Sequence, residues 1–130
     1  MHAGESLNSG LKTDFNIQQL RNRLLPKQDE YLDDGYDAVA FHTSSILICA
    51  NQAALEMFGY SSDELPGMNA WVLFKPEYSK IIMQHLVEKS EEPYHVKAIG
   101  KNKNEFDIEL KGKDFEIAGL PVRAVQIKKL

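Results

Sequence analysis

The sequence predicts an α+β domain built on one antiparallel sheet, and two patterns carry this prediction. Apolar and polar residues alternate near both ends of the chain, most strictly in "EFDIEL" (105–110). Such alternation is typical of a strand with one solvated face. The middle of the chain, 51–89, instead places apolar residues at helical spacings of three and four. Strands grouped at both ends of a helical middle favour an α+β architecture.

The bulk composition is that of one globular domain. The chain has 130 residues, of which 43% are apolar and 26% charged, with a formal net charge of −4. Its lysines are scattered, whereas nucleic-acid binding requires a dense positive face. Cys49 is the only cysteine, so an internal disulfide is excluded. The sequence has neither an apolar stretch of about 20 residues for a membrane span nor a signal peptide, so we expect a cytoplasmic protein.

The first 34 residues are expected to precede the domain proper. Residues 1–12, rich in glycine and serine, predict a flexible leader. Residues 13–34 predict a helix and a linker, with Thr13 or Asp14 as the N-cap and Pro26 as the end of the helix. One face of this helix carries Ile17, Leu20 and Leu24. A helix this short is marginal alone, so that face must pack on the domain or on a second copy of the helix.

Residues 35–67 predict a hairpin followed by a capped helix. Two short strands, "YDAVAFH" (36–42) and "ILICA" (46–50), are joined by a brief polar break, as in a hairpin. Asn51 then caps a helix that ends at Gly59, where a left-handed residue is favoured. Ser61 and Glu64 have the spacing of a capping box and predict another short helix.

The rest of the chain predicts two more helices and three strands. "MNAWVLFK" (68–75) is expected to form a short helix, and Pro76 suits the first position of a longer one over about 77–89. Strands are expected at 94–100, 105–110 and 122–130, with a turn at "KNKN" (101–104). The segment 111–121 is expected to be a looser connection.

The central motif resembles that of a known family. Residues 51–54 ("NQAA"), 58–60 ("FGY"), 61–65 ("SSDEL") and Gly67 resemble the core motif of PAS domains. The segments 101–110 and 121–129 resemble the family's later hairpin and its last strand, so the resemblance covers about residues 35–130. It implies a five-stranded antiparallel sheet with short helices and one long connecting helix on one face. It also implies a sensory or interaction module, often dimeric through a preceding helix, which here would use Ile17, Leu20 and Leu24.

The resemblance further implies a cavity between the sheet and the long helix. Small-molecule pockets are concave and mostly apolar, and ten residues are candidates to line this one: Phe41, Met57, Trp71, Phe74, Ile82, His85, Leu86, Val96, Phe106 and Ile108. The alternative is that these residues simply fill the core without a ligand.

The same resemblance raises two possible cofactors, haem and flavin. Some PAS relatives hold haem through a histidine on the long helix, and His85 lies there, one turn later than the usual position. Light-sensing relatives need a reactive cysteine after the "E-L-x-G" motif, and "GMNAWVLF" (67–74) contains none. Flavin binding without that cysteine lacks support in the sequence.

Three functional hypotheses follow. The first is a sensory module of a signalling protein, such as a histidine kinase or a cyclic-dinucleotide enzyme, that couples a small ligand or dimer packing to an effector domain. The second is a ligand-free protein–protein dimerisation module, and a haem sensor using His85 is a variant of the first. The third, a small enzyme, is not expected, because the sequence contains no phosphate loop, metal-ligand spacing or catalytic triad pattern.

Overall fold

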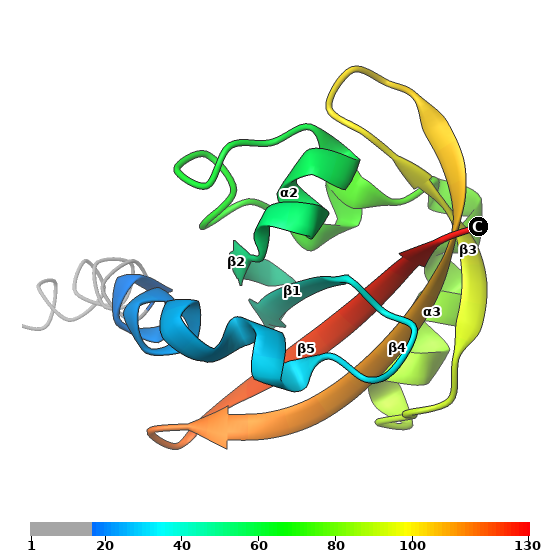
Figure 1. Ribbon diagram of the computed structural model, residues 1–130. Helices are drawn as coiled ribbons and strands as arrows, with labels where there is room; N and C mark the ends of the chain where they lie inside the picture. Colours follow the sequence, from blue (N-terminus) through cyan, green and yellow to red (C-terminus); the bar gives the residue numbers. More distant parts are fainter. Residues whose placement is uncertain (1–16) are drawn as a thin grey trace, which may run out of the picture.

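The computed structural model describes residues 17–130, which contain a five-stranded antiparallel sheet (Figure 1). The strands lie in the order β2-β1-β5-β4-β3, so the last strand of the chain is central. This arrangement confirms the predicted fold class. The predicted leader (1–12) and the N-cap at Thr13 or Asp14 lie outside the described residues. The strand bounds are β1 (Ala38–Thr43), β2 (Ile46–Ala50), β3 (Tyr94–Ile99), β4 (Glu105–Ile117) and β5 (Leu120–Lys129).

Helical segments cover both faces of the sheet (Figure 1). An N-terminal helix over 17–24 lies on one face, which we call the outer face. The segments between β2 and β3 lie on the opposite, inner face. These segments are the helices α2 (Gln52–Phe58) and α3 (Ser79–Val87) and the 3-10 helices η2 (Ala70–Leu73) and η3 (Pro76–Tyr78).

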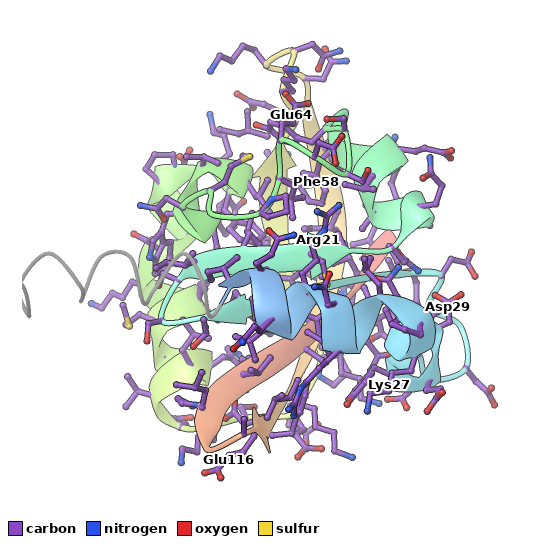
Figure 2. All side chains as sticks on the ribbon, turned by 90° about the vertical axis from the view of Figure 1, so that its left-hand side faces the viewer. Arg21, Lys27, Asp29, Phe58, Glu64 and Glu116 are labelled. Carbon is purple, nitrogen blue, oxygen red and sulfur yellow. The ribbon has the colours of Figure 1, made fainter. Side chains whose placement is uncertain are left out.

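The N-terminal helix packs on the chain's own sheet (Figure 2). Ile17, Leu20 and Leu24 are 6%, 3% and 0% exposed and pack with Val39 and Phe41 of β1. The predicted dimer contact through these three side chains is therefore corrected: in this arrangement they are buried within the chain and are not open to a second copy. We expected this helix to pack either on the domain or on a second copy of itself, and in the structure it packs on the domain.

The segment continues past the predicted end at Pro26. The α-helix gives way at Leu25 to a 3-10 helix, η1 (Leu25–Tyr31), with Pro26 in its first turn. Proline cannot donate the backbone hydrogen bond that an α-helix would need there, but it fits the first turn of a new helix. The proline therefore changes the helix type rather than ending the segment.

The first hairpin forms as predicted. Ser44 and Ser45, which connect β1 to β2, both have positive φ angles of 48° and 68°. Two such residues in sequence make the tight turn whose twist matches that of the strands. The pairing register shifts between Phe41 and His42, and His42 stays directly opposite Arg123 of β5.

The Asn51 side chain makes four hydrogen bonds at the start of α2. Its side-chain oxygen accepts hydrogen bonds from the backbone N–H groups of Ala54 and Val39, both at 3.1 Å. Its amide nitrogen donates to the Asp37 carbonyl at 2.8 Å and to the Asp29 carboxylate at 3.0 Å. The predicted N-cap is thus confirmed, and the same side chain also joins η1 to β1.

The predicted capping box forms, but the helix after it does not. The Ser61 N–H donates to the Glu64 carboxylate at 2.8 Å, and the Glu64 N–H donates to the Ser61 hydroxyl at 3.2 Å. A single turn closes from Leu65 N–H to the Ser61 carbonyl at 3.3 Å before Gly67, whose φ is 89°. Pro66 and Gly67 stop the segment after that turn.

The connecting helix is shorter than the predicted span of about 77–89. A 3-10 turn, η3, comes first, and α3 then covers Ser79–Val87. The short helix predicted in 68–75 is the 3-10 helix η2. The segments beside η2 also pair with the sheet edges, since Ala70 N–H donates to Ser45 O and Lys75 N–H donates to Lys97 O. These bonds satisfy backbone groups that an edge strand would otherwise expose.

The connection predicted to be loose at 111–121 is instead part of a long hairpin. β4 continues unbroken to Ile117, and β5 begins at Leu120. Ala118 and Gly119 have φ angles of 51° and 81° and form a two-residue turn. Phe115 and Ile117 keep the alternation going, but they face the outer side and pack near the N-terminal helix. The charged residues before them, Lys111, Lys113 and Asp114, interrupt that pattern in the sequence.

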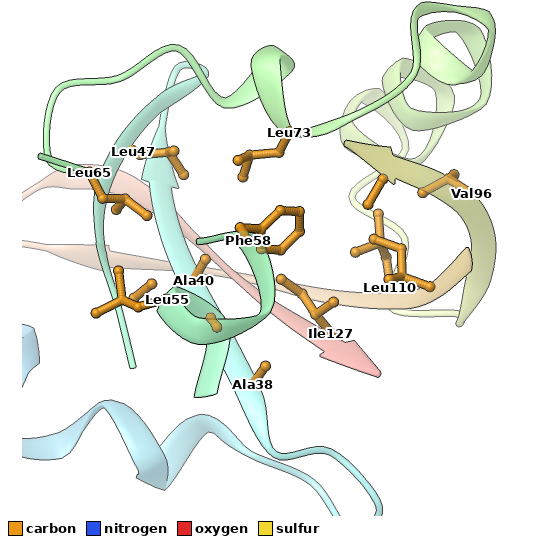
Figure 3. Close-up of a cluster of buried hydrophobic side chains, with 14 of the residues drawn as sticks. Ala38, Ala40, Leu47, Leu55, Phe58, Leu65, Leu73, Val96, Leu110 and Ile127 are labelled. Carbon is orange, nitrogen blue, oxygen red and sulfur yellow. The ribbon is translucent and has the colours of Figure 1, made fainter. Parts of the chain in front are cut away.

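The sheet separates two apolar clusters. The inner cluster centres on Phe58 of α2, which lies among Leu73, Ile127 and Ala40 (Figure 3). The outer cluster lies under the N-terminal helix and includes Phe41 and Cys49. The inner side chains define the space in which a ligand could bind.

Candidate functional site

A small cavity lies between the sheet and the segments from η2 to α3. Its volume is about 40 Å³. One water needs roughly 10–15 Å³ of such space, so about three waters or a molecule of a few heavy atoms would fill it. The lining residues come from all five strands and from the covering segments: Ala40, His42, Ser45, Leu47, Ala70, Trp71, Leu73, Phe74, Ile82, Leu86, Tyr94, Leu110, Gly112, Arg123, Val125 and Ile127.

Most of this lining is apolar. Leu73 of η2 and Ile82 of α3 are 3% and 5% exposed and cover the cavity from above the sheet. Leu110 and Ile127, on neighbouring central strands, are each 1% exposed and form its floor. An apolar wall with a few polar groups is the usual character of a small-molecule site.

The polar end of the cavity is formed by Arg123, which is only 5% exposed. Its Nη2 donates to the Ser90 carbonyl at 2.5 Å. Its Nη1 lies 3.1 Å from Asp114 Oδ1, an ion pair without hydrogen-bond geometry, and has no hydrogen-bond partner among residues 17–130. A buried guanidinium therefore retains unused donor capacity beside the cavity.

Gly112 makes room for this guanidinium. A Cβ at position 112 would lie well inside van der Waals contact of Nη2, Nε and Cζ of Arg123. The φ angle of Gly112 is not in the left-handed region, so its role is to allow close approach rather than an unusual backbone conformation.

Gly112→Ala is expected to push the Arg123 guanidinium off β4. Overpacking a filled site costs about 1–3 kcal/mol of unfolding free energy, and chemical denaturation would measure it. Gly119→Ala is the matched control for the added methyl, because open space surrounds that position; its positive φ of 81° adds a cost of about 1 kcal/mol. If the Gly112→Ala protein kept the Arg123 shifts of the parent in its NMR spectrum, the close contact would be refuted.

His42 lies beside Arg123 on the inner face. The two residues are directly opposite in the β1–β5 pairing, and His42 Nδ1 is buried without a hydrogen-bond partner within residues 17–130. Burial, with a smaller contribution from the Arg123 charge, lowers the pKa of His42 to about 4, although the Asp114 charge opposes the shift. His42 is therefore neutral at pH 7, with one ring nitrogen free to accept or donate a hydrogen bond.

The His42 shift predicts a stability loss on mild acidification. The unfolded chain takes up this proton near pH 6.5, whereas the folded chain does so only near pH 4. The contribution of the neutral His42 ring to the stability of the folded state is thus complete above pH 6.5. It is lost as the pH falls to 4, which lowers the free energy of unfolding by about 2–3 kcal/mol. Urea unfolding at pH 7, 5.5 and 4 would measure the loss, and His42→Gln should flatten this part of the profile. A His42 imidazole that titrates near pH 6.5 by NMR would contradict it.

The structure places four of the ten predicted lining residues around the cavity: Trp71, Phe74, Ile82 and Leu86. Val96 and Ile108 lie in the inner core nearby, and Met57 and Phe106 line a separate groove near Gly100. Phe41 was placed on the wrong side of the sheet. It belongs to the outer cluster, because odd-numbered residues of β1 point away from α3.

His85 is not among the residues that line the cavity. Its ring stacks on Tyr94 with a centroid distance of 3.7 Å and an interplanar angle of 8°. Haem does not fit these residues, because the candidate ligand faces a tyrosine ring and the cavity is about 40 Å³. Cys49 lies under the N-terminal helix, and burial raises the pKa of its thiol to about 12, so it is not the reactive cysteine of a flavin site.

The lining residues Arg123, His42 and Gly112 were not predicted from the sequence. A usable signal existed for Arg123, since it shares the two-residue period of Val125 and Ile127, which line the same cavity. No comparable signal marks Gly112. The close approach of a side chain from β5 depends on the β4–β5 register, which the sequence pattern left undetermined.

Residues 17–130 were also compared with the requirements of a membrane span and of a metal site. Within them, no helix is long and apolar enough to cross a membrane. The same residues contain no group of three histidine, cysteine or acidic side chains placed to hold a metal ion.

Comparison with known proteins supplies the family. A family model for the PAS domain matches residues 37–122, whereas no curated protein matches the chain. A PAS domain from a two-component sensor histidine kinase is 14% identical, with a TM-score of 0.65 over 94% of this chain and 99% of its own. A PAS domain from Desulfitobacterium hafniense is 20% identical, with a TM-score of 0.64 and coverage of 78% and 99%. The PAS-B domain of Drosophila melanogaster Cycle, with bound ethylene glycol, is 13% identical, with a TM-score of 0.61 and coverage of 72% and 100%. The family model, the strand order and the sequence motif agree, and this chain belongs to the PAS domain family.

Proposed function

We propose that this PAS domain is a sensory module that binds a small molecule in the inner cavity. PAS domains are generally sensory modules rather than enzymes. The observation that carries the proposal is the mostly apolar cavity between α3 and the sheet, which is also lined by the buried Arg123 and the half-buried His42. A ligand there would favour one packing of α3 and η2 over another, which is how binding shifts a conformational equilibrium.

The N-terminal segment provides a path from the sheet to the chain before the domain. Gln126 of β5 accepts a hydrogen bond from the Asp33 N–H and donates one to the Asp33 carboxylate. Asn51 bonds to Asp29 of η1 at 3.0 Å. Movement of β1 or β5 would therefore displace η1 and the N-terminal helix that precedes it.

The size of the cavity suits small ligands. The Cycle PAS-B domain contains ethylene glycol, a molecule of four heavy atoms, which matches the space for about three waters here. An output of the histidine-kinase or cyclic-dinucleotide type, an effector partner and the cytoplasmic location are further parts of this proposal. They are supported by the likeness in fold to the histidine-kinase PAS domain and by the sequence.

Titration with ethylene glycol, followed by two-dimensional amide NMR, tests the proposal. We expect saturable shifts at Ala40, Leu73 and Gly112 in the parent protein. Ala40→Val, which adds volume to the cavity wall, should abolish them, while Glu116→Val at an exposed position of β4 should not. Shifts that never saturate, or that survive Ala40→Val, would count against a ligand-binding cavity.

A protein–protein contact through α3 is the second candidate. Val72, Met83 and Val87 are 49%, 46% and 73% exposed, and Trp71, Met83 and Val87 line a shallow apolar groove over this helix. Exposed apolar patches of this kind mark interaction sites. If this surface forms a homodimer, light scattering should show a dimer that Met83→Lys together with Val87→Glu converts to a monomer. A monomer at high concentration in the parent protein would exclude it.

A further inference from the structure

Arg123 is buried more deeply than its contacts inside the chain explain. The residue is 5% exposed, and it comes from the central strand β5. Taking a guanidinium out of water is costly unless its donors are satisfied. Its one hydrogen bond among the described residues goes to the Ser90 carbonyl, while Nη1 has none.

The charge partner of Arg123 lies on the solvent side. The Asp114 side chain is 36% exposed, and its Oδ1 is 3.1 Å from Nη1 without hydrogen-bond geometry. A carboxylate arriving from the cavity side could accept bonds from Arg123 that Asp114 does not make. Guanidinium and carboxylate groups match in shape and form the strongest class of protein hydrogen bonds.

Two more polar residues line the same cavity. His42 Nδ1 is buried and unpartnered within residues 17–130, and His42 lies opposite Arg123 in the sheet. Ser45, at the β1–β2 turn, also lines the cavity. Together they offer a second donor to an oxygen held by Arg123.

The remaining walls limit the rest of the ligand. Leu73, Ile82 and Ile127 are apolar and buried, and the cavity volume is about 40 Å³. A phosphate or sulfate would leave most of its oxygens against these side chains without donors. A carboxylate with a tail of one or two carbons would instead place its single polar group at Arg123.

We propose that the inner cavity recognises a short-chain monocarboxylic acid, with its carboxylate on Arg123 and His42 and its apolar tail under α3. This proposal rests on the proposed ligand-sensing function and names the ligand class. Arg123 is then a specificity residue, because an uncharged molecule of the same size gains less from the guanidinium.

Calorimetric or NMR titration with sodium propionate tests the proposal, with 1-propanol as the neutral analogue and sodium chloride as the salt control. We expect propionate to bind at least about tenfold more tightly than 1-propanol, since one charge-assisted hydrogen bond accounts for roughly that factor. Arg123→Gln should remove this preference, because it weakens propionate binding far more than 1-propanol binding. Arg123→Lys, which keeps the charge without the planar fork, should retain part of it.

A second variant keeps the test independent of the folding of Arg123→Gln. Asp114→Asn removes the competing carboxylate, so propionate should bind several-fold more tightly to it, while 1-propanol should not. Equal binding of both molecules, or no effect of Asp114→Asn on propionate, would overturn the carboxylate inference while the cavity itself stands. If neither propionate, 1-propanol nor ethylene glycol binds, the proposed sensing function fails as well.

Discussion

Leu24→Ala is expected to lower the free energy of unfolding by about 2–5 kcal/mol, the usual range for removing a fully buried leucine side chain. Leu24 is 0% exposed and packs in the outer cluster with Phe41 and Cys49. Loss of its side chain would leave a cavity between the N-terminal helix and the sheet. Urea unfolding followed by circular dichroism or by the fluorescence of Trp71 would measure the change.

The neighbouring leucine supplies the control. Leu25 is 39% exposed, so Leu25→Ala should change the unfolding free energy by about 0.5 kcal/mol or less. If Leu24→Ala behaved like Leu25→Ala in a monomeric protein, the helix would not pack on its own sheet. A loss of stability that depended on protein concentration would instead restore the predicted dimer contact of Ile17, Leu20 and Leu24.

Asn51→Ala is expected to cost about 2–4 kcal/mol, more than an ordinary helix cap at about 1 kcal/mol. The Asn51 side chain is 7% exposed and makes four hydrogen bonds, to Ala54, Val39, Asp37 and Asp29. The substitution leaves the buried Val39 N–H without its side-chain acceptor. It also releases η1 from β1, so amide exchange of residues 25–31 should accelerate.

Asn69→Ala is the matched comparison. Asn69 also caps a helix, through one hydrogen bond from the Trp71 N–H at 2.9 Å, but it is exposed. Its loss should cost about 1 kcal/mol or less. Equal effects of the two substitutions would mean that Asn51 acts only as a cap and does not connect the N-terminal segment to the sheet.

Local features could be predicted because local chemistry determines them. The cap at Asn51, the left-handed Gly59 and the Ser61–Glu64 box each depend on residues a few positions apart. Strand faces follow from alternation, which puts Val39 and Phe41 on one face of the first strand, and both lie in the outer cluster. Alternation cannot show which face of the sheet carries α3. For that reason Phe41 was predicted to line the cavity, although it lies in the outer cluster.

Features that depend on distant segments were the ones missed. Whether Leu20 meets a sheet or another helix is decided by residues at least 19 positions away in the chain, such as Val39. The length of β4 was underestimated because Lys111, Lys113 and Asp114 interrupt its hydrophobic pattern. Arg123 is buried only because Gly112, on the neighbouring strand, leaves room for it.

The existence of the inner cavity is the central claim, and diffraction from a crystal equilibrated under xenon pressure tests it most directly. Xenon binds small dry apolar cavities without needing a polar partner. We predict one xenon atom in contact with Leu73, Ile82 and Ile127, with no such atom in the Ala40→Val protein. Continuous side-chain density filling that space, with no xenon in it, would show that these residues only pack the core and would contradict the sensing function.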